Sequence, residues 1–524
     1  MAAVRRNPVT AAIVALTIVA LALRIYQLTR PDYLLGVTEY DDGTDFGSAL
    51  QLVNGHLPYR DFVIVQPPGI TLLMAPVALL AKGVGTAWAM GIGRILTALA
   101  GAAAVTLGGL LVRQRGMLAV VLTCGILAIY PSAVQAAHTV LLEPWLVLFC
   151  LAGALAVFDR DRITTSLPRL VGGGLLFGFA GAIKVWAVLP VLVILALSAR
   201  RPRRALAYLA GVVAGFVVPV LPFAALAPRT FYNSVVIAQL VRKDAVRIPL
   251  SYRLHQMTGL TDFTTAGPLV LVIFSLALVA AVVGCALVAT RLTRHGPPEL
   301  EWFGLVTATL VVISFLWPAD FYYHYPGFLA PFLALAVALP SARLVDALRP
   351  AASRRVLARW LARYSVAAAS IVIIGLGITQ AVFESSLQPP LAPTTPGLDT
   401  SVVTAASNLI PPGSCVLTDQ VSFTIAANRF YSNVPGCSLM VDGVGTDYSL
   451  AHGLNAVTGA QKNPAVRAVW MSALEHAQYV WLSNISYKRI PWTSGEITGY
   501  FDRNFVPVLG GPFGLYVHKG LQPR

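Results

Sequence analysis

Runs of about 20 apolar residues recur along this chain of 524 residues, and short arginine-rich segments separate many of them. A run of that length is what an α-helix needs to cross the apolar part of a bilayer. Hydrophobic residues make up 56% of the chain and charged residues only 12%, whereas soluble domains carry about 25% charged residues. A soluble core cannot bury so much apolar sequence, so we predict a polytopic α-helical membrane protein.

The chain is strongly basic, with a formal net charge of +15. In a soluble protein this excess would indicate a nucleic-acid partner. Here the arginines lie between apolar runs, which is typical of the cytoplasmic loops of membrane proteins. We therefore predict membrane lipid as a partner and no nucleic acid.

The N-terminal apolar run fits either a signal peptide or a retained span. Arg5 and Arg6 precede about 17 apolar residues, and no small-residue cleavage site follows them. Because signal peptides end at such a site, we interpret the run as a first span with its N-terminus in the cytoplasm.

Placing the basic clusters inside the cell predicts about eleven spans and an extracytoplasmic C-terminus. The segment 67–81 fits either a short span or an interfacial helix, and we favour the interfacial helix because the basic segment 113–116 then stays inside. The basic segment 241–247 is the exception, since it falls in an outer loop. The predicted spans are 8–28, 91–112, 117–135, 139–157, a hairpin formed by 170–199, 205–226, 267–290, 302–317, 325–346 and 365–383.

The composition changes at about residue 384. A Pro-rich linker is predicted at 384–399, between a membrane part at 1–383 and a small extracytoplasmic α/β domain at 400–524. In this last part "SCVLTD", "YVWLS" and "GLYVHK" are predicted strands, and 463–477 is a predicted helix capped by Asn463.

The cysteines indicate no metal site, because there is no CxxC or His-rich pattern. Cys415 and Cys437 lie in the tail and are a possible disulfide if that part is outside the cytosol. The other three fall in apolar runs and are interpreted as inert core residues: Cys124, Cys150 and Cys285. No cofactor is predicted, and a divalent metal is possible but not predicted.

The first outer segment concentrates acidic residues. It holds Glu39, Asp41, Asp42, Asp45 and Asp61, out of 23 acidic residues in the chain. An acid in an exposed loop is usually solvated, and this is our interpretation of Asp45. Asp61 fits a role on the acceptor side or a cap on the turn that precedes it. Asp41 and Asp42 are adjacent and close to the membrane, so we predict that they are catalytic.

Further polar residues are predicted at the outer ends of spans, where charged groups are costly and are functional candidates. Arg94 and Lys184 fit either phosphate binding or anchors that extend to the interface. His324 and Tyr325 fit either donor binding or an aromatic belt. Glu143 fits either catalysis or an ion pair with one of the two cations. The predicted topology gathers all of them at one face.

This set of residues suits one kind of chemistry. A carboxylate can act as general base on an acceptor hydroxyl, and arginine or lysine can hold a phosphate leaving group. Nucleotide sugars are cytosolic and should not reach the outer face. The substrate type that fits is therefore a sugar carried on a lipid phosphate.

The order of these features resembles the GT-C superfamily of integral-membrane glycosyltransferases. The resemblance is to the branch with protein O-mannosyltransferases, aminoarabinose transferases and actinobacterial envelope mannosyl- and arabinosyltransferases, and it covers about 8–383. Gln66 departs from the pattern, because many relatives have His there. The matching features are Asp41-Asp42, the run "GHLPYRDFVIVQPPG" from Gly55 to Gly69, Glu143, Lys184, and His324-Tyr325 followed by Pro331.

The resemblance implies an inverting transfer from a polyprenyl-phosphate sugar on the extracytoplasmic face of the plasma membrane. The sugar would be mannose, or alternatively arabinofuranose, and the acceptor a cell-envelope glycan, a lipoglycan or a protein. Asp41 would be the base, with Asp42 as the alternative. We expect Lys184, His324, Tyr325 and Arg94 to bind the donor phosphate, and Asp61 and Glu143 to serve the acceptor or the structure. The rival functions are a transporter or flippase of polyprenyl-linked precursors and a non-catalytic assembly protein.

Overall fold

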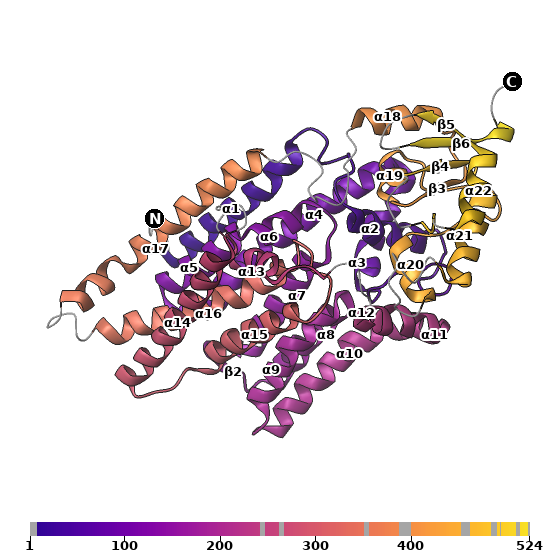
Figure 1. Cartoon of the computed structure of the whole chain (residues 1–524). Coiled ribbons are helices and arrows are strands. Elements are labelled where there is room, and N and C mark those ends of the chain that lie inside the picture. The colour runs from indigo at the N-terminus through magenta and orange to yellow at the C-terminus, as the bar shows by residue number, and fades with distance from the viewer. Residues whose placement is uncertain are drawn as a thin grey trace, which may run out of the picture.

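The structure, a computed structural model, describes residues 8–241, 247–260, 267–349, 356–386, 400–451, 462–483, 490–492, 494–509 and 514–521. A bundle of long helices forms the membrane part, and a small α/β domain covers one end of it (Figure 1). The helices of the membrane part are α1 (Pro8–Thr29), α2 (Tyr40–Val53), α3 (Gly69–Leu79), α4 (Ala81–Val112), α5 (Met117–Ile129), α6 (Pro131–Gln135), α7 (Leu142–Val157), α8 (Leu167–Ile183), α9 (Val188–Ser198), α10 (Pro202–Leu226), α11 (Pro228–Phe231), α12 (Ala238–Val241), α13 (Leu250–Thr258), α14 (Pro268–Thr293), α15 (Glu299–Leu316), α16 (Pro326–Leu348) and α17 (Val356–Ser386).

The predicted membrane fold is confirmed. Within the described ranges, seven helices are long and apolar enough to cross a membrane, or eight if the bent pair of α5 and 131–138 forms one span. Four shorter apolar helices lie at α3, α7, α8 and 185–198. The predicted number of spans is reached when the last three also cross, and α3 then corresponds to the predicted interfacial helix. The predicted outer loop around 241–247 falls largely outside the described residues.

The predicted hairpin at 170–199 breaks at Lys184. Helix α8 ends at Ile183, and Lys184 has an extended backbone with φ −150° and ψ 129°. A short 3-10 turn, Val185–Ala187, leads from there into α9. The break leaves the lysine at a helix end rather than in a continuous helix.

The first part of the acidic outer segment is a helix, not a loop. Glu39 is its N-cap, and the Glu39 side chain accepts a hydrogen bond from the Tyr40 backbone N–H at 2.9 Å. Asp41 and Asp42 follow in the first turn of α2. Carboxylates near a helix N-terminus are stabilised by the unpaired N–H groups and the helix dipole. Asp41 and Asp45 are four residues apart and therefore share a helix face.

The tail forms the predicted α/β domain. Its sheet has the order β3-β4-β6-β5, with β3 (Val416–Thr418) parallel to β4 (Tyr479–Trp481), and with β6 (Leu515–His518) antiparallel to both β4 and β5 (Phe505–Leu509). The three predicted strands are confirmed as β3, β4 and β6, whereas β5 was not predicted. Its helices are α18 (Thr400–Leu409), α19 (Ser422–Ala426), α20 (Gly443–Leu450), α21 (Pro464–His476) and α22 (Gly495–Asn504).

Local details of the tail also follow the sequence. Asn463 caps α21 by accepting from the Ala465 N–H at 2.9 Å. Cys415 and Cys437 form a disulfide with a Cα–Cα distance of 5.5 Å. Of the predicted linker, 387–399 lies outside the described residues, and 384–386 continue helix α17.

The tail domain packs closely on the membrane part. The Thr86 hydroxyl donates to the Ile425 carbonyl at 2.6 Å, and the Ala87 N–H donates to Asn428 Oδ1 at 3.0 Å. A Cβ at Gly43 of α2 would lie 2.4 Å from the Ser422 backbone nitrogen. Only glycine permits α2 and α19 to approach this closely.

We expect Gly43→Ala to destabilise the contact between α2 and the tail. Overpacking of this kind costs about 1–3 kcal/mol, and thermal unfolding of the purified protein measures it. Gly47→Ala on the same helix is the matched control, because its Cβ would meet side-chain atoms no closer than 3.5 Å. That control should be neutral or slightly stabilising, since alanine is the better helix former. Equal melting temperatures for the two variants would contradict the close approach.

Candidate active site

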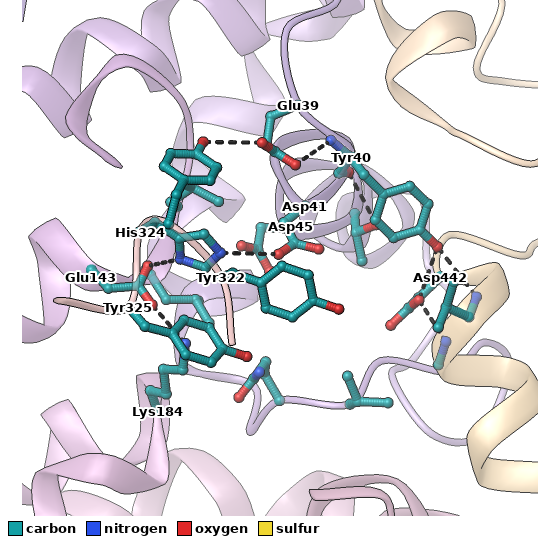
Figure 2. Close-up of a pocket in the computed structure, with 18 of the residues that line it drawn as sticks. Glu39, Tyr40, Asp41, Asp45, Glu143, Lys184, Tyr322, His324, Tyr325 and Asp442 are labelled. Atoms are coloured by element: carbon teal, nitrogen blue, oxygen red, sulfur yellow. Dashed lines mark hydrogen bonds and ion pairs between the residues drawn. The ribbon is translucent and has the colours of Figure 1, made fainter. Parts of the chain in front are cut away.

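A cavity of about 550 Å³ lies where α2, the segment before α16 and the tail domain meet (Figure 2). Five of the predicted site residues line it: Asp41, Glu143, Lys184, His324 and Tyr325. Gln66, the departure from the family pattern, lines it as well. The cavity is lined by parts of 39–48, 64–70, 141–143, 248–252, 321–325 and 442–448, together with Lys184.

Four of the predicted residues form a chain of ionisable groups in one wall. Lys184 Nζ donates to Glu143 Oε1 at 2.6 Å, and His324 Nδ1 lies 3.0 Å from Glu143 Oε2. On its other side, His324 Nε2 lies 3.7 Å from Asp41 Oδ2. Figure 2 shows the chain running from Lys184 through Glu143 and His324 to Asp41. The sequence left open whether Glu143 pairs with Arg94 or with Lys184, and the structure pairs it with Lys184.

Asp41 differs from the other members of the chain in its exposure. Its side chain is 45% exposed, whereas the side chains of Glu143 and His324 are 1% and 5% exposed. It stands in the first turn of α2 and lines the cavity. A carboxylate that is open to the cavity and beside an imidazole is placed to take a proton from a bound molecule.

Two aromatic rings lie close to the Lys184 side chain. Its ammonium lies 3.8 Å from the ring centroid of Trp186 and 4.5 Å from that of Tyr325. The ring of Tyr322 stacks on His324 with centroids 5.9 Å apart. Aromatic faces stabilise cations, so this wall holds positive charge in an apolar environment.

Glu39 joins α2 to the segment that carries His324. Its Oε2 accepts from the Tyr323 hydroxyl at 3.0 Å, while its Oε1 caps α2. Burial, together with the nearby Asp41 carboxylate, raises the pKa of Glu39 to about 7. Glu39 was not predicted as a site residue, and its hydrogen bond across to Tyr323 fixes the two halves of the cavity relative to each other.

Our interpretation of Asp45 as a solvated acid is wrong. It is only 8% exposed and lines the cavity one turn after Asp41. Burial, with Asp41 and Glu143 nearby, raises the pKa of Asp45 well above its ordinary value. The helical spacing from Asp41 would have placed it correctly if the Glu39 cap had been recognised in the sequence.

Asp442 is a second cavity residue that the sequence did not reveal. It caps α20 by accepting from the Gly445 N–H at 2.7 Å, and it accepts from the Tyr40 hydroxyl at 3.1 Å. It is 4% exposed and lines the cavity from the side of the tail domain. Nothing in the sequence places residue 442 next to residue 40.

Asp42 and Arg94 lie outside the cavity, so their predicted direct roles need correction. Arg94 donates to Asp42 Oδ2 through Nε, at 3.0 Å, and through Nη2, and its Nη1 donates to three backbone carbonyls in 33–36. Asp42 Oδ1 accepts from the Val140 N–H at 2.7 Å. Both side chains are 0% exposed. The pair is a buried ion pair that connects α2 to α4. Its carboxylate and guanidinium are engaged within the protein and do not reach the cavity.

Asp61 also lies away from the cavity. Its Oδ2 accepts from the Leu57 N–H at 2.7 Å, and Arg60 binds both carboxylate oxygens at 2.8 and 2.9 Å. The hydrogen bonds from Arg60 lower the pKa of Asp61. Of the two predicted roles, the structure supports the turn cap.

Metal ligands do not gather at this site. No group of three or more His, Cys, Asp or Glu side chains with a geometry for a metal ion occurs in the described ranges. The carboxylates of the cavity are spread over α2, α7 and α20, and Glu143 is engaged by Lys184.

The sequence model of glycosyltransferase family 87 matches residues 65–316. ArnT from Cupriavidus metallidurans in its apo state has a TM-score of 0.59 at 14% identity, covering 98% of this chain and 98% of that chain. ArnT bound to undecaprenyl phosphate has a TM-score of 0.58 at 14% identity, covering 98% of this chain and 100% of that chain.

An oligosaccharyltransferase from Archaeoglobus fulgidus, in complex with zinc and sulfate, has a TM-score of 0.52 at 13% identity, covering 97% of this chain and 73% of that chain. No curated protein sequence matches the chain. At these identities, the solved structures show a shared fold.

Proposed function

We propose that this chain, as a membrane glycosyltransferase of the GT-C type, transfers a sugar from a polyprenyl phosphate to an acceptor hydroxyl. The transfer inverts the configuration of the anomeric carbon. The single observation that carries the proposal is the arrangement across one cavity. An open carboxylate, Asp41, lies at the end of a buried wall that holds the basic residues Lys184 and His324.

The cationic wall suits a phosphate leaving group. Lys184 has three N–H donors, and Glu143 takes one of them. A protonated His324 would add a second positive charge between Asp41 and Glu143. Undecaprenyl phosphate, the lipid bound to ArnT, carries a phosphate of this kind. We therefore assign donor binding to Lys184, His324 and Tyr325.

The reaction then follows from the geometry. The acceptor hydroxyl gives its proton to Asp41, and its oxygen attacks the anomeric carbon of the donor. The bond between that carbon and the phosphate oxygen breaks, and its electron pair stays on the phosphate. Polyprenyl phosphate leaves with an additional negative charge, which Lys184 and His324 stabilise. Attack opposite the leaving phosphate inverts the anomeric centre.

Two residues keep supporting roles in this proposal. Asp42 and Arg94 hold α2 against α4, and they fix the direction of Asp41 without touching the substrate.

Mannose is the sugar we favour, with arabinofuranose as the alternative, and the acceptor is a cell-envelope glycan, a lipoglycan or a protein.

A transfer assay separates this function from that of a flippase. Purified protein receives polyprenyl-phosphate mannose or polyprenyl-phosphate arabinofuranose, together with an extract of envelope acceptors. We expect release of polyprenyl phosphate that requires both protein and acceptor. Movement of the lipid across vesicles without any loss of the sugar would favour the transporter instead.

The proposed location is the plasma membrane, with the N-terminus in the cytoplasm and the tail domain outside. The positive-inside distribution and the disulfide in the tail support it. An alkaline phosphatase fused after residue 524 should be active, and a fluorescent protein that matures only in the cytosol should stay dark. The opposite pattern would move the cavity to the cytoplasmic face and overturn the choice of a lipid-linked donor.

A further inference from the structure

The cavity has a second wall, opposite the cationic one, that the proposed mechanism does not use. We call it the polar wall, and it consists of Tyr40, Thr44, Asp45, Asp442 and Tyr448. The first three belong to α2, and the last two lie at the start of α20 and within it, in the tail domain. Two parts of the chain about 400 positions apart therefore build one surface.

Asp45 is the residue of this wall that points to a ligand. Its side chain is buried, with only 8% of the residue exposed, and it lines the cavity. In the part of the chain that the structure describes, no hydrogen bond to its carboxylate is formed. A carboxyl group that faces a cavity and has no protein partner is available to a bound molecule. A bound molecule that offers a hydroxyl group can form a hydrogen bond with Asp45.

Asp442 is held at the opposite end of the wall by two donors. The Tyr40 hydroxyl and the Gly445 N–H both donate to Oδ1, at 3.1 and 2.7 Å. The Thr44 hydroxyl lies nearby and donates to the Val441 carbonyl at 3.3 Å. These bonds fix the carboxylate against α2, so the tail domain presents a pre-oriented group to the cavity.

The balance of charge restricts what can occupy this wall. Five carboxylates line the cavity: Glu39, Asp41, Asp45, Glu143 and Asp442. Its basic residues, Lys184 and His324, both lie beside Glu143 in the opposite wall. The five residues of the polar wall include no lysine, arginine or histidine, so a phosphate or carboxylate on the acceptor would find no positive charge there. A neutral sugar brings several hydroxyl donors, and its apolar face can pack on Tyr40 or Tyr448.

We propose that the polar wall is the acceptor subsite and that it takes an uncharged glycan, whose hydroxyls hydrogen-bond to Asp45 and Asp442. This inference rests on the proposed function, which it deepens by naming the acceptor class. It also gives the tail domain a role, because Asp442 makes acceptor recognition depend on the docking of α20.

The test is direct binding, because it does not need the donor to be known. The full-length protein in nanodiscs is applied to an array of neutral mannans, arabinans and galactans, together with phosphorylated and uronic-acid glycans. We expect binding to a neutral glycan and none to the anionic ones. Binding only to anionic glycans, or to no glycan, overturns the inference.

Substitutions then locate the subsite. Asp442→Asn keeps the helix cap, because asparagine is an equally good N-cap, and Asp45→Asn keeps the shape of the side chain. Each should weaken the binding of the neutral glycan by about two- to tenfold, as the loss of a hydrogen bond to the ligand does. The matched control is Asp502→Asn, an exposed acid of the same domain, which should bind as the unmodified protein does. Unchanged binding in both site variants overturns the assignment.

Failure of this inference can be told apart from failure of the proposed function. If the chain releases polyprenyl phosphate in the transfer assay but binds only anionic glycans, the reaction stands and the acceptor class is wrong. If it binds neutral glycans through Asp45 and Asp442 but releases no polyprenyl phosphate, the subsite stands and the reaction is wrong.

Discussion

Replacing Asp41 with asparagine should lower turnover by about 10²–10⁴-fold, which is the typical contribution of a positioned acid or base. Asparagine keeps the shape of the side chain and its hydrogen bonding but cannot accept the proton. Donor affinity should change little, because in the proposed function Lys184 and His324, and not Asp41, hold the phosphate. The measurement is the rate of polyprenyl phosphate release at saturating donor.

The control for Asp41→Asn must be chosen with the structure in view. Asp42→Asn leaves Arg94 buried with a weaker partner, so it should lower thermal stability and protein yield in addition to any effect on rate. Asp61→Asn is the cleaner control, because that side chain lies outside the cavity and asparagine can still accept from the Leu57 N–H. Near-normal turnover in Asp41→Asn, with Asp42→Asn folded and inactive, would exchange the roles of the two acids. Activity in both would remove the catalytic role from this helix.

Replacing Lys184 with methionine should weaken donor binding by about ten- to a hundredfold, because a charge-assisted hydrogen bond to phosphate contributes roughly 1.5–3 kcal/mol. The same change strips Glu143 of its lysine partner at 2.6 Å. Breaking a buried ion pair from one side costs about 3–5 kcal/mol of stability. A loss of affinity in the single variant therefore has two causes, one in the site and one in the fold.

A double variant separates these causes. Lys184→Met combined with Glu143→Leu removes both charges, and such a replacement is often neutral or stabilising. We expect the melting temperature to recover while donor affinity, read from the Michaelis constant for the lipid-linked sugar, stays low. Recovery of both would make Lys184 a structural partner of Glu143 alone. Unchanged affinity in the single variant would likewise leave Lys184 with a structural role only.

The sequence could place one group of residues at the site because topology alone brings them together. Glu143, Lys184 and His324 each stand at the outer end of a predicted span, and residues at such ends share one membrane face. Their distances did not follow from topology, since these depend on the break in α8 at Lys184 and on how the bundle packs.

Arg94 shows the limit of that reasoning. It also stands near the outer end of a predicted span, but the structure turns it toward Asp42 and the carbonyls of 33–36. A buried cation is retained only where enough acceptors surround it. The sequence showed that a charge was present, and only the packing decides between a ligand-binding and a structural cation.

Asp45 and Asp442 were missed for different reasons. Asp45 was interpreted as part of a loop, although the Glu39 cap and the spacing from Asp41 were in the sequence. Asp442 carried no such signal, because its place depends on the close contact of Gly43 with Ser422, which docks the tail on α2. Contacts between distant segments arise from complementary surfaces, and a single sequence does not record which surfaces meet.

The anomeric configuration of the transferred sugar tests the central claim most directly. A donor labelled with ¹³C at its anomeric carbon allows NMR to follow that carbon from polyprenyl phosphate to product. Our account predicts the opposite anomer in the product and the release of one polyprenyl phosphate for each sugar transferred. A product with retained configuration, or a donor that stays intact with every acceptor, would contradict it.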